Sequence, residues 1–379
     1  MGSSRRCQER IPLRIAVLWT RLSGYLNACL KELASREGVS LLVVHEAAGE
    51  EAPFDATQFD WIRDRVEWRN LRELESICDR VRAFVPEIML MPSWHVAAYR
   101  KLGREFSGKC WRVMAMDNAW RGTLKQRIGT WIAPYYLHPV TDAVWLPGER
   151  QTVFARKLGF DHDEILRGMF TCDQPAFAAF HQARIAEGRS VPRAFLYVGR
   201  FFPEKGIDIL AQAYRHYRSS TPNPWPLVCC GAGPLRSSLE GIEGIHVKGF
   251  IQPQEIASVF GAAGCFVLPS RYEPWALVIH EAAAAGLLIL ASEEVGAAPH
   301  LVQPGYNGFI CSKGDTRGLA GLMSRVTAMS YARLDEMSRA SFLLSCQFSP
   351  KRWADTLLSS FGELVRNRKA VEAPAALTR

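Results

Sequence analysis

Two segments in the second half of the chain place charged side chains between a predicted strand and a predicted helix. The first is Gly199–Gly206, with the sequence GRFFPEKG, and a helical pattern over Ile207–Tyr217 follows it. Arg200 and Lys205 would flank the start of that helix, where free N–H groups and the helix dipole favour an anion. Two cations at such a place suit a diphosphate. A strand–helix loop with solvated charges explains this segment equally well when it is considered alone.

The second segment is Glu273–Glu281, with the sequence EPWALVIHE. If the segment were helical throughout, its two carboxylates would lie roughly 12 Å apart, about the length of a diphosphate with part of its sugars. Each Glu could then hold hydroxyls at one end of a ligand, while the amides of Trp275, Ala276 and Leu277 bind phosphate between them. The alternative makes Glu273 a helix-start acid and Glu281 a surface residue. Glu281 adjoins Ala282–Ala285, however, and an apolar helix is an expensive place for an unpartnered charge.

A third segment, Gly231–Leu235 (GAGPL), is a glycine turn after an apolar run. Gly231 and Gly233 would let a nucleotide approach the backbone. The turn lacks the third glycine of a dinucleotide fingerprint, and a plain tight turn remains the simpler interpretation.

These segments need strands and helices to position them, and both halves of the chain supply such a pattern. Short apolar runs predict strands, and amphipathic stretches such as Leu22–Ala34 predict the helices between them. The predicted strands are Leu13–Trp19, Val39–His45, Glu87–Met91, Arg112–Met116, Ala143–Leu146, Ala194–Val198, Leu227–Cys230, Ile245–Lys248, Cys265–Leu268, Leu287–Ala291 and Gly308–Cys311. Alternation of this kind predicts an α/β protein with parallel sheets, which bind ligands beyond the carboxyl ends of their strands.

The alternation lapses over a polar stretch without clear strands at Thr171–Arg193, which we interpret as the connection between two domains. We therefore expect a Rossmann-like domain over residues 1–170 and another over residues 171–348. Ser349 and Pro350 fit the N-cap and first position of a helix over Lys351–Val365. The tail from Ala370 is expected to fray.

Composition limits the class of protein without selecting a function. The chain has 379 residues, of which 48% are hydrophobic and 22% charged, as in a globular protein of two domains. No apolar run is long enough for a membrane span, and we expect no secretory signal. The 10 cysteines are scattered without a C-x-x-C pair, which fits the cytoplasm and argues against zinc or a disulfide framework. The net charge of +8 is compatible with nucleic acid, a membrane face or a phosphorylated substrate.

The order and spacing of the motifs resemble those of glycosyltransferase family 4, the retaining group 1 glycosyltransferases with the GT-B fold. The similarity runs from about Ala194 to Leu319. It is carried by GRFFPEKG, GAGPL and EPWALVIHE, together with VKGF at Val247–Phe250 and GYNGF at Gly305–Phe309. The resemblance implies two Rossmann-like domains that face a cleft, with the helix of residues 349–379 crossing back to the first domain.

The resemblance also implies roles for individual residues. Arg200 and Lys205 would bind the diphosphate, and Gly199, Gly231 and Gly233 would shape its loops. Glu273 is expected at the donor sugar and Glu281 at the ribose, with the base near the backbone of Phe250 and Ile251. The family retains configuration without a metal, so we expect neither metal nor cofactor. Asp161 and Asp163 have D-x-D spacing but lie at a predicted helix end far from these segments, and we interpret them as part of a polar turn.

The first half matches the family less closely. Gly24, followed by Tyr25, is what remains of the usual glycine pair in its first loop. Asp117, followed by Asn118, stands where many relatives have a His that touches the donor sugar. At positions 232 and 300 the family usually has an acid, where this chain has Ala232 and His300. At position 276 it usually has a glycine, where this chain has Ala276. Acceptor contacts are expected from Ser23, Gly24, Tyr25, Trp94, His95, Asp117 and Asn118, although a lone His such as His95 is more often structural.

Arg100–Arg127 is the most basic stretch, with eight cations against two acids, and Trp111, Trp120, Trp131, Tyr135 and Tyr136 lie in or just after it. Basic residues with interfacial aromatics suit the cytoplasmic face of an anionic membrane and a lipid-linked or phosphorylated acceptor. A solvated basic face over core tryptophans is the equal alternative. We do not expect nucleic acid as a partner, because no recognition motif accompanies the charge.

The sequence therefore predicts a retaining hexosyltransferase that moves a sugar from a UDP- or GDP-linked donor to a saccharide or lipid-linked hydroxyl in cell-envelope polysaccharide or glycolipid synthesis. We expect it in the cytoplasm, peripheral on the inner membrane face. The alternatives are a nucleotide-sugar epimerase or hydrolase, or a non-catalytic nucleotide-sugar-binding protein of the same fold.

Overall fold

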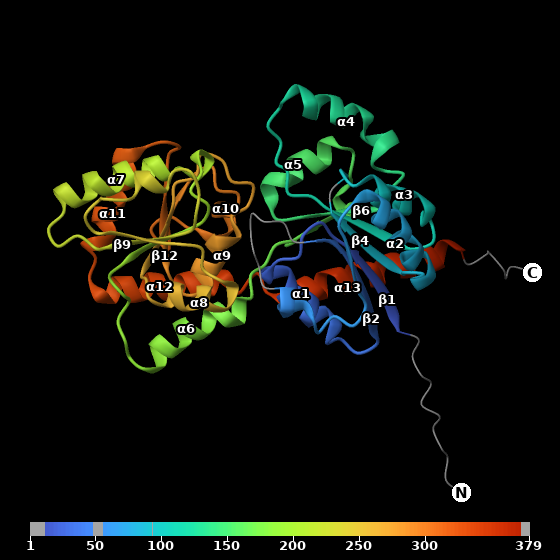
Figure 1. The fold of residues 1–379 in the computed structure, drawn as a ribbon, viewed down its shortest axis with the longest axis horizontal. Coiled ribbons are helices and arrows are strands. Elements are labelled where there is room, and N and C mark those ends of the chain that lie inside the picture. The colour runs from blue at the N-terminus through green and yellow to red at the C-terminus, as the bar shows by residue number, and fades with distance from the viewer. Residues whose placement is uncertain (1–11, 48–55, 93, 373–379) are drawn as a thin grey trace, which may run out of the picture.

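The computed structural model describes residues 12–47, 56–92 and 94–372, which form two lobes that lie side by side (Figure 1). Each lobe is built on one parallel sheet with helices on both of its faces. The helix α13 runs from the second lobe beneath the first. The predicted fold class, two Rossmann-like units with a returning C-terminal helix, is confirmed.

Seven parallel strands of the described chain form the first sheet, in the order β3-β2-β1-β4-β5-β6-β7. The strands are β1 (Leu13–Leu18), β2 (Val39–Glu46), β3 (Arg65–Trp68), β4 (Ile88–Pro92), β5 (Trp111–Ala115), β6 (Ala143–Leu146) and β7 (Ile165–Arg167). The helices between them are α1 (Gly24–Ala34), α2 (Leu71–Phe84), α3 (Ala97–Glu105), α4 (Leu124–Tyr136) and α5 (Glu149–Lys157), with 3₁₀ turns η1 (Ala56–Phe59) and η2 (His162–Glu164).

Six described strands form the second sheet in the order β10-β9-β8-β11-β12-β13, which repeats the connectivity of the first. The strands are β8 (Phe195–Val198), β9 (Leu227–Cys230), β10 (Ile245–Lys248), β11 (Cys265–Leu268), β12 (Leu288–Ser292) and β13 (Gly308–Cys311). The helices are α6 (Gln174–Ala186), α7 (Ile207–Ser220), α8 (Pro253–Gly261), α9 (Leu277–Ala284), α10 (Ala298–Leu301), α11 (Thr316–Thr327), α12 (Tyr331–Ser345) and α13 (Pro350–Glu372), with 3₁₀ turns η3 (Pro203–Lys205) and η4 (Arg236–Ser238).

The apolar runs became strands because both faces of each sheet are covered. In β4, β5, β6, β11 and β12 every residue is buried, as continuous hydrophobic runs in parallel sheets require. The predicted strands are all present within one or two residues of their expected bounds. The pattern missed β3 and β7, which are short strands toward the edges of the first sheet.

The stretch at Thr171–Arg193 is not an irregular connection. Residues Gln174–Ala186 form α6, which begins with Pro175 in its first turn and packs against α8 and α9 of the second lobe. Its buried face includes Phe177 and His181. The helix was missed because its buried positions mix apolar and polar side chains, which weakens the helical period.

The C-terminal helix α13 is part of the core of the first lobe. Ser349 caps it as predicted, because its hydroxyl accepts the N–H of Arg352 at 3.1 Å. Trp353 stacks on Trp145 of β6 with ring centroids 4.7 Å apart and donates its indole N–H to the carbonyl of Met169 at 2.9 Å. The helix also packs against α1. The end of the chain beyond Glu372 lies outside the described residues.

Among the residues that the structure describes, no helix has both the length and the apolar content needed to cross a bilayer.

Removing the Trp353 side chain tests whether α13 holds the first lobe together. Trp353→Ala should lower the free energy of unfolding by roughly 3–5 kcal/mol, because it deletes a large buried side chain and a buried hydrogen bond. Trp131→Ala is the matched control. Trp131 is 82% exposed, so its loss should change stability by no more than about 0.5 kcal/mol. Urea denaturation followed by circular dichroism measures both variants. Similar midpoints for the two would contradict the packing role of α13.

Candidate functional site

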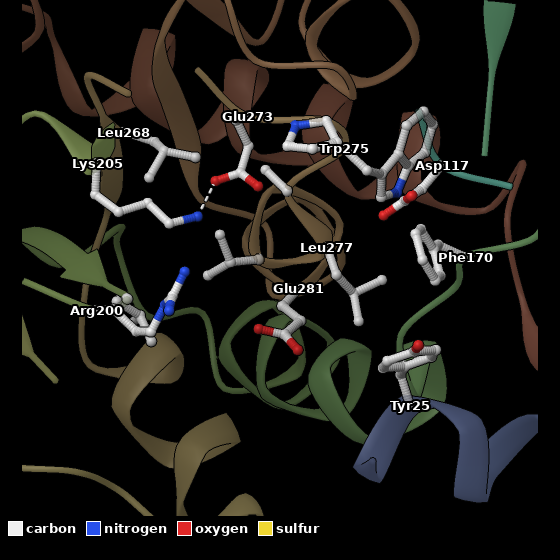
Figure 2. A pocket seen from close by; sticks show the side chains of 15 residues that line it. Tyr25, Asp117, Phe170, Arg200, Lys205, Leu268, Glu273, Trp275, Leu277 and Glu281 are labelled. Atoms are coloured by element: carbon white, nitrogen blue, oxygen red, sulfur yellow. Dashed lines mark hydrogen bonds and ion pairs between the residues drawn. The ribbon is translucent and has the colours of Figure 1, made fainter. Parts of the chain in front are cut away.

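A pocket of about 410 Å³ lies between the carboxyl ends of the two sheets (Figure 2). The second lobe contributes the loops after β8 and β11 and the start of α9. The first lobe contributes Tyr25 and Asp117, which come after β1 and β5, and Phe170 reaches in from the segment before α6. In the second sheet β8 lies between β9 and β11. The strand order reverses at β8, and the pocket lies at this point.

An ion pair between Lys205 and Glu273 lies in this pocket, and Figure 2 draws it as a dashed line. Their side chains are only 18% and 11% exposed. The sharp turn at Gly206 aims Lys205 inward: its φ is +69°, and a Cβ there would lie 2.2 Å from the carbonyl oxygen of Pro269. A side chain at position 206 is therefore excluded both by backbone conformation and by space.

Arg200 is the second cation of the pocket, and it is far more accessible. Its side chain is 60% exposed, and its nearest carboxylate, that of Glu204, is 3.5 Å away. Arg200 and Lys205 therefore differ: one cation is already paired inside the pocket, and the other is free to move toward a ligand.

The helix start that faces the pocket is that of α9, whose lining residues include Ala276, Leu277 and Val278. Within the described structure the amides of Trp275, Ala276 and Leu277 donate no backbone hydrogen bond. Ala276 has φ of +73°, a conformation that costs an alanine about 1–2 kcal/mol and explains why the resembled family usually has glycine here. These amides form a donor array next to the two cations.

Two geometric expectations about these segments are wrong. The helix begins only at Leu277, so Glu273 lies in the preceding loop and its separation from Glu281 does not follow from helical rise. The start of α7 does not line the pocket. Its first-turn acid, Asp208, instead forms a bidentate ion pair with Arg271, with both N–O distances 2.6 Å.

Glu281 projects into the pocket from the first turns of α9. Within the described residues its carboxylate has neither a hydrogen bond nor an ion pair. Burial raises the pKa of its carboxyl to about 7. A ligand that donates hydrogen bonds to the carboxylate would favour the ionised form.

A second cavity, of about 530 Å³, opens beside the first and shares Val198, Gly199 and Arg200 with it. It is lined by Gly231, Gly233, Phe250 and Ile251, so it brings together the glycine turn and the two residues predicted near the base. Gly231 has φ of +145°, and a Cβ there would lie 2.0 Å from the carbonyl oxygen of Gly199. The two loops pack directly on each other, which leaves an apolar slot beside the cations.

The residues predicted from the first half divide between two places. Tyr25 lines the first pocket and packs edge-on against Phe170, with ring centroids 5.4 Å apart. Gly24 is the first residue of α1 and does not line that pocket. His95 and Asn118 are exposed and line a third cavity beneath α4, together with Trp94. Asp117 lines both places, and burial raises the pKa of its carboxyl.

No sequence pattern pointed to Gln151, a fully buried residue of α5 that joins the lobes. Its side-chain N–H₂ donates to the carbonyl of Asp117 at 3.2 Å and to that of Pro274 at 2.8 Å. Asp117 and Pro274 line the first pocket from opposite lobes. Nearby, His300 accepts the N–H of Glu149 at 3.1 Å. These bonds fix the loops on the two sides of the pocket, and only the assembled lobes reveal them.

The D-x-D sequence has a local structural role. The carboxylate of Glu164 accepts the N–H of Asp161 at 2.8 Å at the start of η2, and the side chains of Asp161 and Asp163 are exposed. Among the described residues, no three His, Cys, Asp or Glu side chains gather as a metal-binding group.

Part of the basic stretch Arg100–Arg127 is buried. The prediction that the whole stretch forms a surface for an anionic membrane is therefore corrected. Arg112 is 3% exposed and forms an ion pair with Asp142 at 2.7 Å, and Trp111 is a core residue. Trp131 and Tyr135, in contrast, are 82% and 83% exposed. Arg112 and Trp111 therefore do not belong to the exposed basic and aromatic surface, which is centred on α4.

Residues 182–341 match the family model described as "Glycosyl transferases group 1". A glycogen synthase of Mycobacterium tuberculosis is 32% identical over 145 residues, which are 36% of this chain and 34% of that protein. The chain thus aligns with about a third of that relative's length.

Solved structures extend the similarity to both lobes at the level of fold. A glycosyltransferase from Rickettsia africae superposes with a TM-score of 0.72 at 13% identity, over 94% of this chain and 99% of that one. Anabaena Alr3699/HepE in complex with UDP superposes with a TM-score of 0.72 at 17% identity, over 92% of this chain and 100% of that one. This chain has the GT-B fold, and its residues 182–341 match the glycosyl transferases group 1 family.

Proposed function

We propose that the protein transfers a hexose from a nucleotide diphosphate sugar to a hydroxyl group with retention of configuration. The observation that carries this proposal is the grouping of Arg200, Lys205 and the free amides at the start of α9 around one pocket, with an apolar slot beside it. Two cations and a helix N-terminus provide the charge that a diphosphate needs. The slot at Phe250 and Ile251 accommodates a base, and the UDP complex of the Anabaena neighbour supports a uridine nucleotide.

The remaining pocket residues have roles along the donor. The carboxylate of Glu281 accepts hydrogen bonds from the ribose hydroxyls, and that of Glu273 accepts them from the donor sugar. The ion pair with Lys205 orients Glu273 before the donor arrives. When a diphosphate binds, Lys205 bridges Glu273 and a phosphate oxygen, so that neither the cation nor the anion is left alone in the pocket.

The transfer breaks the bond between the anomeric carbon and the phosphate oxygen and forms a bond from that carbon to the acceptor oxygen on the same face. The acceptor proton passes to the departing phosphate. Arg200, Lys205 and the α9 amides stabilise the charge that develops on this phosphate, a role that requires no metal or cofactor. Asp117 faces the pocket from the first lobe and contacts the acceptor or the donor sugar.

The acceptor is a saccharide or lipid-linked hydroxyl of a cell-envelope polysaccharide or glycolipid, and the protein works at the inner face of an anionic membrane. Support comes from α4 and its surroundings. Trp131 and Tyr135 are exposed there, and among the described contacts Arg121, Lys125 and Arg127 have no carboxylate partner. Aromatic and basic side chains on one exposed helix are typical of a membrane interface.

Donor binding and turnover test the assignment of the cations. UDP- and GDP-sugars should raise the melting temperature of the wild-type protein, and Lys205→Met and Arg200→Ala should each lower kcat/KM roughly 10²–10³-fold, because each removes a donor aimed at the developing phosphate charge. Lys351→Met is the control, since Lys351 forms a surface ion pair with Asp355 on α13. Thermal shift and release of the free nucleotide measure these effects.

Four outcomes would contradict the proposal. If no nucleotide sugar stabilises the fold, the donor site is wrong. Full activity in Lys205→Met would remove the role given to that residue. Rapid consumption of donor in the absence of any acceptor would identify a hydrolase, and binding without consumption would identify a nucleotide-sugar-binding protein.

The raised pKa of Glu281 makes two pH effects testable. The folded state holds the proton of Glu281 up to about pH 7, whereas the unfolded chain releases it near 4.3. The native state therefore binds more protons in this interval, so stability should fall as pH rises from about 4.5 to 7, by on the order of 1–3 kcal/mol. Glu281→Gln should remove this component.

Nucleotide binding should show the opposite trend. Because ribose hydroxyls donate to the ionised carboxylate, the affinity of the wild-type protein for UDP should increase between pH 6 and pH 8, and Glu281→Gln should bind weakly and without this dependence. Calorimetric titration and urea denaturation at several pH values measure the two effects. Parallel pH profiles for the two proteins would show that Glu281 does not titrate as described.

A further inference from the structure

A cavity of about 910 Å³ lies beneath α4, and its walls are largely apolar. One wall is a single side of α4, formed by Leu124, Ile128 and Ile132 at helical spacing, and the opposite wall includes Trp94, Phe154 and Leu158. The cavity is larger than either part of the proposed donor site, and its lining belongs to the first lobe.

Helix α4 carries several large apolar side chains that are exposed to solvent. Leu124 is 74% exposed and Ile128 is 52% exposed on the side that lines the cavity. Burying such side chains contributes roughly 1.5–3 kcal/mol each, so a sequence that leaves them open has a ligand or surface to cover them. Trp131 and Tyr135 do not line the cavity, but they are exposed beside Leu124 and Ile128 on the outer edge of the same helix.

The cavity opens onto the proposed site of transfer. Asp117 lines both the cavity and the donor pocket, and His95 and Asn118 stand at the same end. A molecule whose apolar part fills the cavity can therefore present a polar end at Asp117, where the donor sugar is expected.

Cations without carboxylate partners surround this cavity. Lys125 lines it, and the guanidinium of Arg100 lies 5.0 Å from the ring centre of Tyr136, another lining residue. Arg121 lies farther off, in a neighbouring cavity, where its guanidinium is 4.5 Å from the ring centre of Tyr272 of the other lobe. None of the three forms an ion pair within the described residues, in contrast to the buried Arg112. An anionic group beside the apolar chain would complement them.

We propose that the cavity beneath α4 binds the apolar chain of a lipid phosphate acceptor, with the phosphate near Lys125 and the acceptor hydroxyl at Asp117. This inference rests on the proposed function for its final step, the transfer, but the binding itself does not require the donor. Trp131 and Tyr135 contact the membrane surface, so the acceptor chain passes from the bilayer into the cavity along one helix.

A series of n-alkyl phosphates from hexyl to dodecyl, below their critical micelle concentrations, tests the binding. Affinity should rise roughly threefold to fourfold with each added methylene until the cavity is filled, since each buried methylene contributes a fixed increment. Alkyl glucosides of equal length should bind more weakly, and Lys125→Ala should remove most of that difference. Inorganic phosphate alone should bind weakly. Calorimetry measures each affinity, and the thermal shift with UDP reports separately on the donor site.

Gly129 offers a way to fill the cavity without disturbing the fold. It lines the cavity from the middle of α4, and an added Cβ would meet no atom within 4 Å. Gly129→Leu should weaken dodecyl phosphate at least roughly tenfold, equivalent to two or more buried methylenes, and leave the thermal shift with UDP unchanged. Gly321→Leu, at another helical glycine with open space, is the matched control in α11. Trp131→Ala should leave the binding of monomeric alkyl phosphate unchanged.

Affinity that is independent of chain length would overturn the proposal, as would wild-type binding of dodecyl phosphate by Gly129→Leu. Loss of binding in Trp131→Ala alone would also overturn it, because the chain would then lie on the outer side of α4. If affinity depends on chain length but no nucleotide sugar binds, the cavity assignment stands and the proposed donor site is refuted instead.

Discussion

The site depends on a constraint of parallel sheets: every strand ends at the same edge, and every loop that follows a strand emerges there. In the second lobe this brings together Lys205 from the loop after β8 and Glu273 from the loop after β11, although 68 positions separate them in sequence. The same edge receives the free amides at the start of α9. The two sheets face each other with these edges, so the pocket is lined by residues of both lobes.

The two lobes are joined by specific contacts rather than by the linker alone. The helix α13 leaves the second lobe and becomes part of the first core through Trp353. Gln151 bridges the carbonyls of Asp117 and Pro274, one on each side of the pocket. A buried amide whose donors are both satisfied fixes the separation of two loops more closely than apolar packing does, because hydrogen bonds are directional. The pocket geometry thus depends on a residue that does not line it.

Several local features are costly for the fold and are explained by the proposed function. Glu281 is partly buried and has no hydrogen-bond or ion-pair partner among the described residues, Ala276 adopts a left-handed conformation, and α4 exposes large apolar side chains. Each lies on the donor pocket or on the cavity that opens into it through Asp117. Ligands supply what each feature lacks: hydroxyl donors for Glu281, an anion for the amides around Ala276, and an apolar chain for α4. Departures from the resembled family occur in both lobes, at Asp117 in the first and at Ala232, Ala276 and His300 in the second.

The sequence alone predicted the two Rossmann-like units, nearly all strands, the returning helix and the residues that gather in the donor pocket. The strands and the start of the last helix follow from local signals, namely continuous apolar runs and helix caps, whereas the return of that helix and the grouping of the pocket residues were implied by the resemblance that the motif spacing carries. The short strands β3 and β7 and the helix α6 escaped because their patterns are weak. The burial of Arg112, the bridge made by Gln151 and the cavity beneath α4 were decided only by the tertiary structure. In each case the decisive neighbour lies on another strand or helix, and the type of a residue does not encode which distant side chains will surround it.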